Sequence, residues 1–347
     1  MKKFLIKISY TVLPVWLFLV SMAVYLMVTG DNTGDLMRLA LIKGGPEYRD
    51  SICLNLLPRV YYESVDNDSV LRTSTRDVLV IGDSFSHGGG VGKEGDYVNY
   101  LAHDSERHVT VYTPQDPTLS SPMQIAYDLL KLGGVDSTCI KNLVVQEVER
   151  YLVGRHIEFT TQHTSLSHSL PASEQKAAPA SAKKEVSPLL RVKDYIFYHC
   201  FGANPIYDVK LRQPMFGGAQ PDRLYFYNED VKFGIDLDEK ATHKVKTCFD
   251  EVIEMATARG VNLVIVIACD KYDMYQDFIL DNPYPAKTLN EDIERLMAPE
   301  LDRFVIAKRV LHPLVEQGVK DVYLFNDTHW SPESSRLIAA EVAKKLK

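Results

Sequence analysis

A serine near the start of the chain and an aspartate and histidine near its end are the residues that could do covalent chemistry. Ser84 follows an apolar run in "VLVIGDSFS", and Asp327 and His329 follow another in "VYLFNDTHW". A histidine accepts the proton of a serine hydroxyl when a carboxylate holds the imidazole in the correct tautomer. These residue types predict catalysis through an acyl-serine, with Ser84 as nucleophile, His329 as base and Asp327 as its orienter.

Each half of this pattern also has a purely structural interpretation. Gly-Asp-Ser after a strand can be a turn in which Ser84 caps the next helix. The segment from Asp327 to Trp330 can be a capped loop that carries a core tryptophan. The catalytic interpretation is favoured only if both halves lie at the same edge of one sheet.

Apolar runs alternate with helical patterns from Asp77 onward, which predicts such a sheet. The expected strands are residues 78–82, 108–112, 142–146, 261–269 and 321–326. The expected helices are residues 96–104, 121–134, 239–260, most of 287–312, and 331–346. This order predicts a mainly parallel, five-stranded sheet with helices on both faces. Ligands of such sheets bind at the carboxyl ends of the strands, where all three chemical residues fall.

Two stretches resemble a known family. "VIGDSFS" and "NDTHWSPESSRLIAAEV" are similar to the SGNH hydrolase superfamily, and the Asp-x-His-Trp form is most similar to the SGNH domains of alginate O-acetyltransferase-type proteins. The resemblance covers about residues 76–150 and 240–347, where "VVQEVERYL" and "CDKYDMY" also agree with it. It implies a flavodoxin-like, three-layer α/β/α SGNH domain, the roles given above for the serine, histidine and aspartate, and no cofactor.

The oxyanion donors of the superfamily are not recognisable in this chain. A glycine is usual after the second strand and Gly-x-Asn-Asp after the third, but "YTPQDPTLSSP" and "QEVER" stand in those places. Donors must still face the developing charge, and the backbone N–H of Ser84 is the first choice. The side chains that we consider as oxyanion or substrate-binding candidates are Arg150, Tyr272, Glu149 and Lys271. A structural ion pair between Glu149 and Arg150 is the alternative, and Lys271 has the same ambiguity.

The N-terminal segment predicts a membrane anchor. Residues 8–30 carry no charge over about the length of a membrane-spanning helix, and Lys2, Lys3 and Lys7 precede them. A cleaved signal peptide is the alternative, although "VYLMVTG" lacks an A-x-A-like site. The positive-inside rule predicts a single pass through a bacterial-type inner membrane, with a cytoplasmic N-terminus and a periplasmic domain. We therefore expect a tip and anchor over 1–30, a juxtamembrane connection over 31–75, and the SGNH domain over 76–347.

An insertion over residues 154–238 is expected to interrupt this domain. Its first part, to about residue 185, is poor in large apolar residues and predicts a mobile loop. Three histidines lie in or beside that loop, and without ligand spacing they predict solvated side chains rather than a metal site: His156, His163 and His168. Its second part is rich in tyrosine and phenylalanine and predicts short strands or loops, whose rings either stack on sugars or form a small satellite core.

Composition excludes several partners and functions. The formal net charge of −7 argues against nucleic acid, and "GDSFSHGGG" fits neither the dinucleotide fingerprint nor the P-loop. Five scattered cysteines predict no zinc site and no disulfide framework, although one chance pair stays open: Cys53, Cys139, Cys200, Cys248 and Cys269.

The function expected from these features is that of an exported, membrane-anchored serine O-acetyltransferase. Its substrate would be a cell-surface or secreted polysaccharide. The resemblance implies a membrane-bound O-acyltransferase as acetyl supplier. A carbohydrate O-acetyl esterase with the same three residues, and a non-catalytic polysaccharide-binding or assembly protein, are the alternatives.

Overall fold

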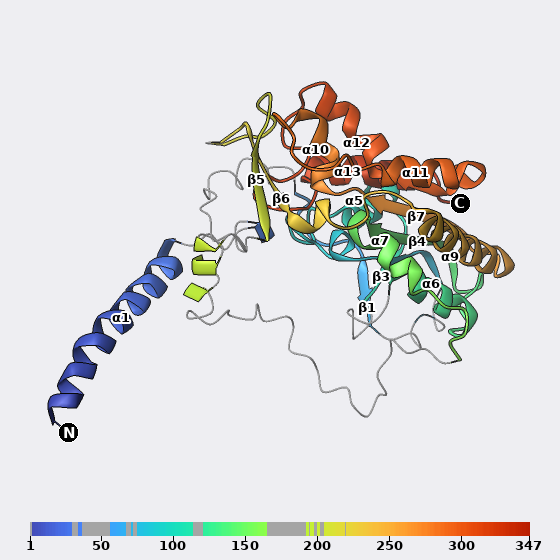
Figure 1. Cartoon of the computed structure of the whole chain (residues 1–347). Helices are drawn as coiled ribbons and strands as arrows, with labels where there is room; N and C mark the ends of the chain where they lie inside the picture. Colours follow the sequence, from blue (N-terminus) through green and yellow to red (C-terminus); the bar gives the residue numbers. More distant parts are fainter. Residues whose placement is uncertain are drawn as a thin grey trace.

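A six-stranded parallel sheet lies at the centre of the computed structural model (Figure 1). The structure describes residues 2–29, 34–36, 56–66, 71, 75–113, 121–164, 192–193, 195–197, 200–201, 205–218 and 220–347. The strands are β1 (Glu63–Val65), β2 (Arg76–Ile81), β3 (Val109–Tyr112), β4 (Ile140–Val148), β7 (Asn262–Ala268) and β8 (Phe304–Ile306). Every pair of neighbours is parallel.

The central strands are apolar on both faces, as expected for a parallel sheet covered by helices. Successive residues of β2 alternate between two cores: Val78 and Val80 belong to one, and Leu79 and Ile81 to the other. All four are fully buried. Burial of both faces fixes the register, because a shift by one residue would exchange the two sets of side chains.

Helices cover both faces and complete the expected three layers. The first core receives side chains from α5 (Tyr97–Ser105), α12 (Ala307–Glu316) and α13 (Pro332–Ala343). The second receives them from α6 (Pro122–Lys131), α7 (Glu149–Ile157), α9 (Glu239–Ala258) and α11 (Leu289–Leu296). α6 and α9 lie side by side on their face (Figure 1). Ser121 caps α6 by accepting the Gln124 amide at 3.0 Å, with Pro122 in the first turn, as predicted.

The strand order places the end of β2 at a switch point. The order is β1-β3-β2-β4-β7-β8, so the chain leaves β2 for β3 on one side and then returns to β4 on the other. Without β1 this is the flavodoxin-like order, in which ligands bind where the order reverses. Ser84 lies just beyond the carboxyl end of β2.

The prediction of a strand over residues 321–326 is wrong. The other four predicted strands are present, and two further strands bring the sheet to six. Residues 321–326 form a turn in which Tyr323 makes only an isolated bridge to Trp330. Carbonyl groups that a strand would offer to its neighbour are taken by Lys271, whose ammonium donates to the oxygens of Leu324 and Phe325. The additional strands are β1, within the expected connection, and β8, within the expected helical segment.

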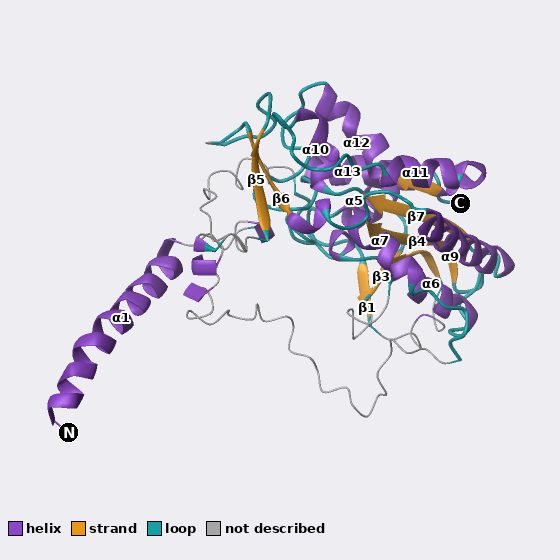
Figure 2. Cartoon of the chain, in the orientation of Figure 1, coloured by secondary structure: helices purple, strands orange, loops and turns teal. Residues whose placement is uncertain are grey.

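The tyrosine-rich segment contains an antiparallel hairpin of β5 (Ile206–Lys210) and β6 (Arg223–Tyr227), which stands apart from the main sheet (Figure 2). Leu224 and Phe226 point into the first core. Tyr207 stacks on Tyr284, with ring centroids 4.9 Å apart. The satellite-core interpretation therefore describes much of this segment, since its rings pack on one another and on the domain.

The N-terminal helix α1 extends over Lys2–Thr29. Among the described residues no helix is long and apolar enough to cross a bilayer, so the expected span over residues 8–30 is not found there. Four of the cysteines are free thiols, namely Cys139, Cys200, Cys248 and Cys269, whereas Cys53 lies outside the described residues. The stretch from residue 165 to 191, which includes His168 and most of the expected loop, also lies outside them.

Candidate active site

The turn that carries Ser84 is tied to the end of β4. Asp83, rather than Ser84, caps the short 3₁₀ helix Ser84–Ser86, since its carboxylate accepts the Phe85 amide at 3.3 Å. The other Asp83 oxygen accepts the Val148 amide at 2.9 Å. Gly82 leaves no room for a side chain, because a Cβ there would lie 2.2 Å from the Ser86 hydroxyl oxygen. Ser84 is left exposed at the sheet edge.

The turn that carries Asp327 and His329 is held from beneath by a buried lysine. Lys271, the first residue of α10 (Lys271–Tyr275), is fully buried. Its ammonium donates to the carbonyl oxygens of Leu324 at 2.7 Å, Phe325 at 2.8 Å and Asp327 at 3.1 Å. Burial lowers the pKa of Lys271 to about 7, against the opposing charges of Asp35 and Asp327. This candidate thus supports the turn through its backbone.

The buried Trp330 fixes the same turn from the other side. Its indole N–H donates to the Tyr323 hydroxyl at 2.9 Å, and that hydroxyl donates to the Cys269 carbonyl. Phe85, which follows Ser84, packs on this turn, with its ring centroid 4.6 Å from Trp330 and 4.5 Å from His329. The tryptophan is therefore a core residue, as one interpretation expected, and it also orients the residue before it.

Ser84, His329 and Asp327 form a continuous hydrogen-bonded path. Ser84 Oγ lies 2.7 Å from His329 Nε2, and His329 Nδ1 lies 2.5 Å from Asp327 Oδ1. Burial raises the pKa of Asp327, but the charge of His329 and its hydrogen bond outweigh this and lower it. Burial lowers the pKa of His329, but Asp327 outweighs this and raises it. Such an imidazole can accept the serine proton and hold it beside a carboxylate.

A glycine-rich loop wraps closely around His329. A Cβ on Gly89 would lie 2.2 Å from His329 Nε2, and one on Gly90 would lie 2.9 Å from His329 Cβ. Gly90 also has a φ of +79°, which favours glycine. The Gly89 amide donates to the Ser84 carbonyl at 2.8 Å, so the loop is fixed to the serine turn as well. Only glycine backbone leaves space for a reactant beside the imidazole.

Three of the oxyanion candidates bond to groups other than Ser84 and His329. The Arg150 guanidinium donates to Asp270 at 2.6 Å and Asp230 at 3.3 Å. The Glu149 carboxylate accepts the Asp270 amide at 2.8 Å, so Glu149 and Arg150 share this neighbour rather than pairing with each other. The Tyr272 hydroxyl donates to the Pro285 carbonyl at 2.8 Å. These side chains therefore form buried contacts that join the segments after β4 and β7.

The expectation of solvated histidines is wrong for His156. This residue lies within α7, which continues through Gly154, and its side chain is fully buried. Its Nε2 lies 2.6 Å from a Glu147 carboxylate oxygen. His163 is partly buried and lies 2.8 Å from Asp128. Glu147 lies 9 positions before His156, and Asp128 lies 35 positions before His163. Neither spacing is that of a ligand motif, which is why the sequence did not reveal these pairs.

One contributor to the site had no recognisable signal in the sequence. The backbone amide of Asp35 donates to Asp327 Oδ2 at 2.9 Å, and the Asp35 carboxylate accepts the Thr328 amide at 2.9 Å. The contact joins positions 292 residues apart. No local periodicity or motif reports such a pair, so only the tertiary structure reveals it.

Among the residues that the structure describes, two groups of side chains have ligand atoms close enough to share a metal ion. They are Asp35, Asp327 and His329, and Glu149, Cys269 and Asp273. In the first group the imidazole of His329 bonds to Asp327, and the carboxylate of Asp35 accepts from Thr328. In the second, the neighbouring ammonium groups of Lys287 and Lys308 compete with a cation. We therefore assign no metal to either group.

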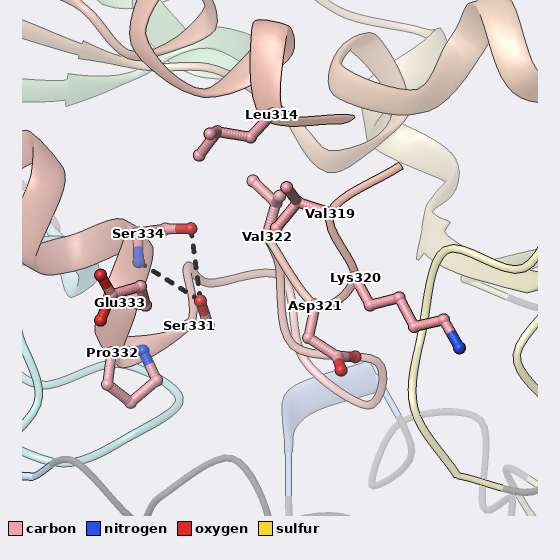
Figure 3. Close-up of a pocket in the computed structure, with 9 residues that line it drawn as sticks. All are labelled: Leu314, Val319, Lys320, Asp321, Val322, Ser331, Pro332, Glu333 and Ser334. Carbon is pink, nitrogen blue, oxygen red and sulfur yellow. Dashed lines mark hydrogen bonds between the residues drawn. The ribbon is translucent and has the colours of Figure 1, made fainter. Parts of the chain in front are cut away.

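A cavity of about 190 Å³ lies between the end of α12 and the start of α13 (Figure 3). Leu314 and Val322 line one part of it, and Ser331 and Ser334, which are hydrogen-bonded to each other, line another. Neither Ser84 nor His329 is among its lining residues. This cavity is therefore separate from the candidate active site.

Replacing the buried lysine tests its role beneath the turn. Lys271→Met is expected to lower the free energy of unfolding by about 3 kcal/mol, because three buried carbonyl groups lose their donor. Denaturant unfolding of the full chain measures this loss. The control Lys246→Met removes an exposed pair with Asp250 on α9, which is expected to cost about 0.5 kcal/mol or less. Equal effects of the two substitutions would contradict the role of Lys271.

Comparison with known proteins supports the family suggested by the motifs. Residues 220–347 match the family model described as the SGNH hydrolase-like domain of the acetyltransferase AlgX. The match includes Asp327, His329 and Lys271, whereas Ser84 lies outside it. No curated protein matches the chain. The resemblance to SGNH hydrolases of the alginate O-acetyltransferase type is therefore confirmed, on the segment that carries the aspartate and histidine of the site.

Proposed function

We propose that the protein is a serine O-acetyltransferase that acts on a cell-surface or secreted polysaccharide. The observation that carries the proposal is the path from Ser84 through His329 to Asp327, with 2.7 Å between the serine oxygen and the imidazole. The match to an acetyltransferase family model supports the reaction class and the polysaccharide substrate.

The proposed reaction passes through an acetyl-serine. Ser84 Oγ attacks the carbonyl carbon of the acetyl donor while His329 takes the hydroxyl proton, and Asp327 stabilises the imidazolium. The bond to the donor oxygen then breaks, and His329 returns the proton to that oxygen. A sugar hydroxyl then gives its proton to His329 and attacks the acetyl carbonyl carbon. The bond to Ser84 Oγ breaks, and His329 returns the proton to that oxygen. The backbone N–H of Ser84 is the proposed donor to the negatively charged oxygen.

A carbohydrate O-acetyl esterase is the second candidate. Water would take the place of the sugar hydroxyl in the second half of the reaction. The exposure of Ser84 favours this candidate, because water can reach an acetyl group on a side chain that lies exposed among the described residues.

Replacing the nucleophile tests both candidates. Ser84→Ala is expected to lower acetyl release from p-nitrophenyl acetate by about a thousandfold or more, since the covalent route is lost. Assays of the full chain with bare oligosaccharide distinguish the products: acetylated sugar supports the transferase, and acetate alone supports the esterase. Ser137→Ala, a change to an exposed turn serine, is the control. A folded protein without any acyl chemistry would favour the binding or assembly protein.

Crowding the imidazole tests the glycine loop. Gly89→Ala is expected to lower kcat/KM by about a hundredfold, because its Cβ would occupy the space beside His329 Nε2 and displace the reacting groups. Gly154→Ala is the matched control, since a Cβ there has no atom within 4 Å and lies on a helix. Steady-state kinetics and thermal unfolding of both variants separate a catalytic loss from a folding loss. Similar kcat/KM values for the two variants would contradict the expectation.

We also propose that α1 attaches the protein to a membrane, with the domain on the exported side and a membrane-bound O-acyltransferase as acetyl supplier. Large apolar side chains of α1 are exposed, among them Trp16 at 58% and Phe18 at 61%. The lysines before the uncharged segment support a cytoplasmic N-terminus. Acetyl-CoA is not expected outside the cytoplasm, which is why the transferase needs a supplier.

Cell fractionation tests the attachment. The full chain is expected to stay in the membrane pellet after carbonate extraction, and a version without residues 2–30 is expected to be released, because the apolar helix is the only proposed attachment. Protease added to cells is expected to digest the domain only after the outer membrane has been permeabilised. Release of the full chain by carbonate would contradict the attachment.

A further inference from the structure

A three-residue segment between α1 and the domain is inserted against the candidate site. Leu36 is fully buried in the first core. Gly34 has a φ of +80°, and a Cβ there would lie 2.1 Å from the backbone oxygen of Asn326. The segment Gly34–Leu36 is thus packed directly on the turn that carries Asp327, at a distance that only glycine permits.

Asp35 holds this turn through its backbone and its side chain together. Its amide donates to Asp327 Oδ2 at 2.9 Å, the oxygen that does not face His329. Its carboxylate accepts the Thr328 amide at 2.9 Å and the Thr328 hydroxyl at 2.6 Å. Asp35 is therefore hydrogen-bonded both to the Asp327 carboxylate and to Thr328, the residue between Asp327 and His329.

A second element fixes Asp35 in turn. The Tyr227 hydroxyl, at the end of β6, donates to Asp35 Oδ2 at 3.0 Å. The Arg150 guanidinium lies over the Tyr227 ring, 5.2 Å from its centroid. The Asp35 carboxylate thus accepts three hydrogen bonds, and its position is determined by the hairpin as well as by the turn.

We propose that Asp35 is a positioning residue of the active site, which orients Asp327 and His329 and adds a second negative charge beside the imidazole. Its carboxylate oxygen lies 4.0 Å from His329 Nδ1. The proposal rests on the proposed function, because it assigns Asp35 to the same reaction. It extends the site beyond the SGNH motifs to a segment that neither motif includes.

The charges around His329 determine the direction of the expected effect. Asp327 is its first partner, Asp35 lies on the same side, and Asp83 adds a weaker negative charge. Lys271 lies beneath the turn and bonds to its carbonyl groups. A negative charge favours the imidazolium, so loss of the Asp35 charge lowers the pKa of His329. The acidic limb of the pH profile, which requires neutral His329, then moves to lower pH.

The test compares three variants of the full chain. Asp35→Asn removes the charge with little change in shape. Gly34→Ala removes no ionisable group, but its Cβ forces the segment that carries Asp35 away from Asn326. Asp250→Asn, on the exposed face of α9, is the matched control because it removes a carboxylate paired only at the surface with Lys246. NMR titration follows the His329 imidazole, assigned with His329→Gln, and steady-state kinetics give kcat/KM against pH.

The expected result is a lower His329 pKa in Asp35→Asn and in Gly34→Ala, with kcat/KM reduced by about ten- to hundredfold and the acidic limb shifted downward. The control is expected to match the unaltered protein. A His329 pKa and a pH profile unchanged in both variants would overturn the role of Asp35. If Asp35→Asn does not fold, Gly34→Ala decides by the same two measurements.

The two proposals can fail separately. Activity that survives in Ser84→Ala would overturn the proposed function. The NMR titration requires no turnover, so a lowered His329 pKa in Asp35→Asn would still support the contact between Asp35 and the imidazole. If the His329 pKa is unchanged in Asp35→Asn and Ser84→Ala is inactive, the serine mechanism is supported and the role of Asp35 is contradicted.

Discussion

The ammonium group of Lys271 beneath the Asp327 turn is the interaction on which the geometry of the site depends. The turn has no neighbouring strand to receive its carbonyl groups, and one buried cation takes three of them. A backbone that would otherwise leave buried acceptors unpaired is thereby held in a single shape. Asp327 and His329 project from this shape toward Ser84, which belongs to a separate turn at the end of β2.

Lys271 is itself placed by a buried charge cluster at the ends of β4 and β7. Asp270, the residue before it, accepts from Arg150 at 2.6 Å and from Lys287 at 2.5 Å. Burial raises the pKa of Glu149 well above its usual range, and one of its oxygens has no partner among the described residues. Arg150 and Lys287 both face the Asp270 carboxylate, and Arg150 also faces that of Asp230. Removing one member of such a cluster would leave an uncompensated buried charge, which is strongly destabilising.

The segment with Asp35 also limits where the site can lie. Asp35 follows Thr29, the last residue of α1, by six residues. A chain of that length spans at most about 20 Å, so the end of α1 lies within that distance of the site. With α1 attached to a membrane, as proposed, acetyl transfer would occur close to the bilayer surface, within reach of a membrane-bound supplier.

The sequence by itself determined the α/β class, the parallel sheet, and Ser84, Asp327 and His329 as one chemical set. Strand and helix periodicities are local, and the rule that parallel strands end at one edge places Ser84 there. Asp327 and His329 reach the same edge on a turn that Lys271 holds, not at the end of a strand. It did not reveal that residues 321–326 form a turn, because their apolar pattern is also that of a strand and Lys271, which takes their carbonyl groups, lies 53 positions from Leu324. Nor did it reveal Asp35, which bonds to Asp327 across 292 positions. Only the tertiary structure decided these, since hydrogen bonds between residues distant in the chain leave no periodicity in the sequence.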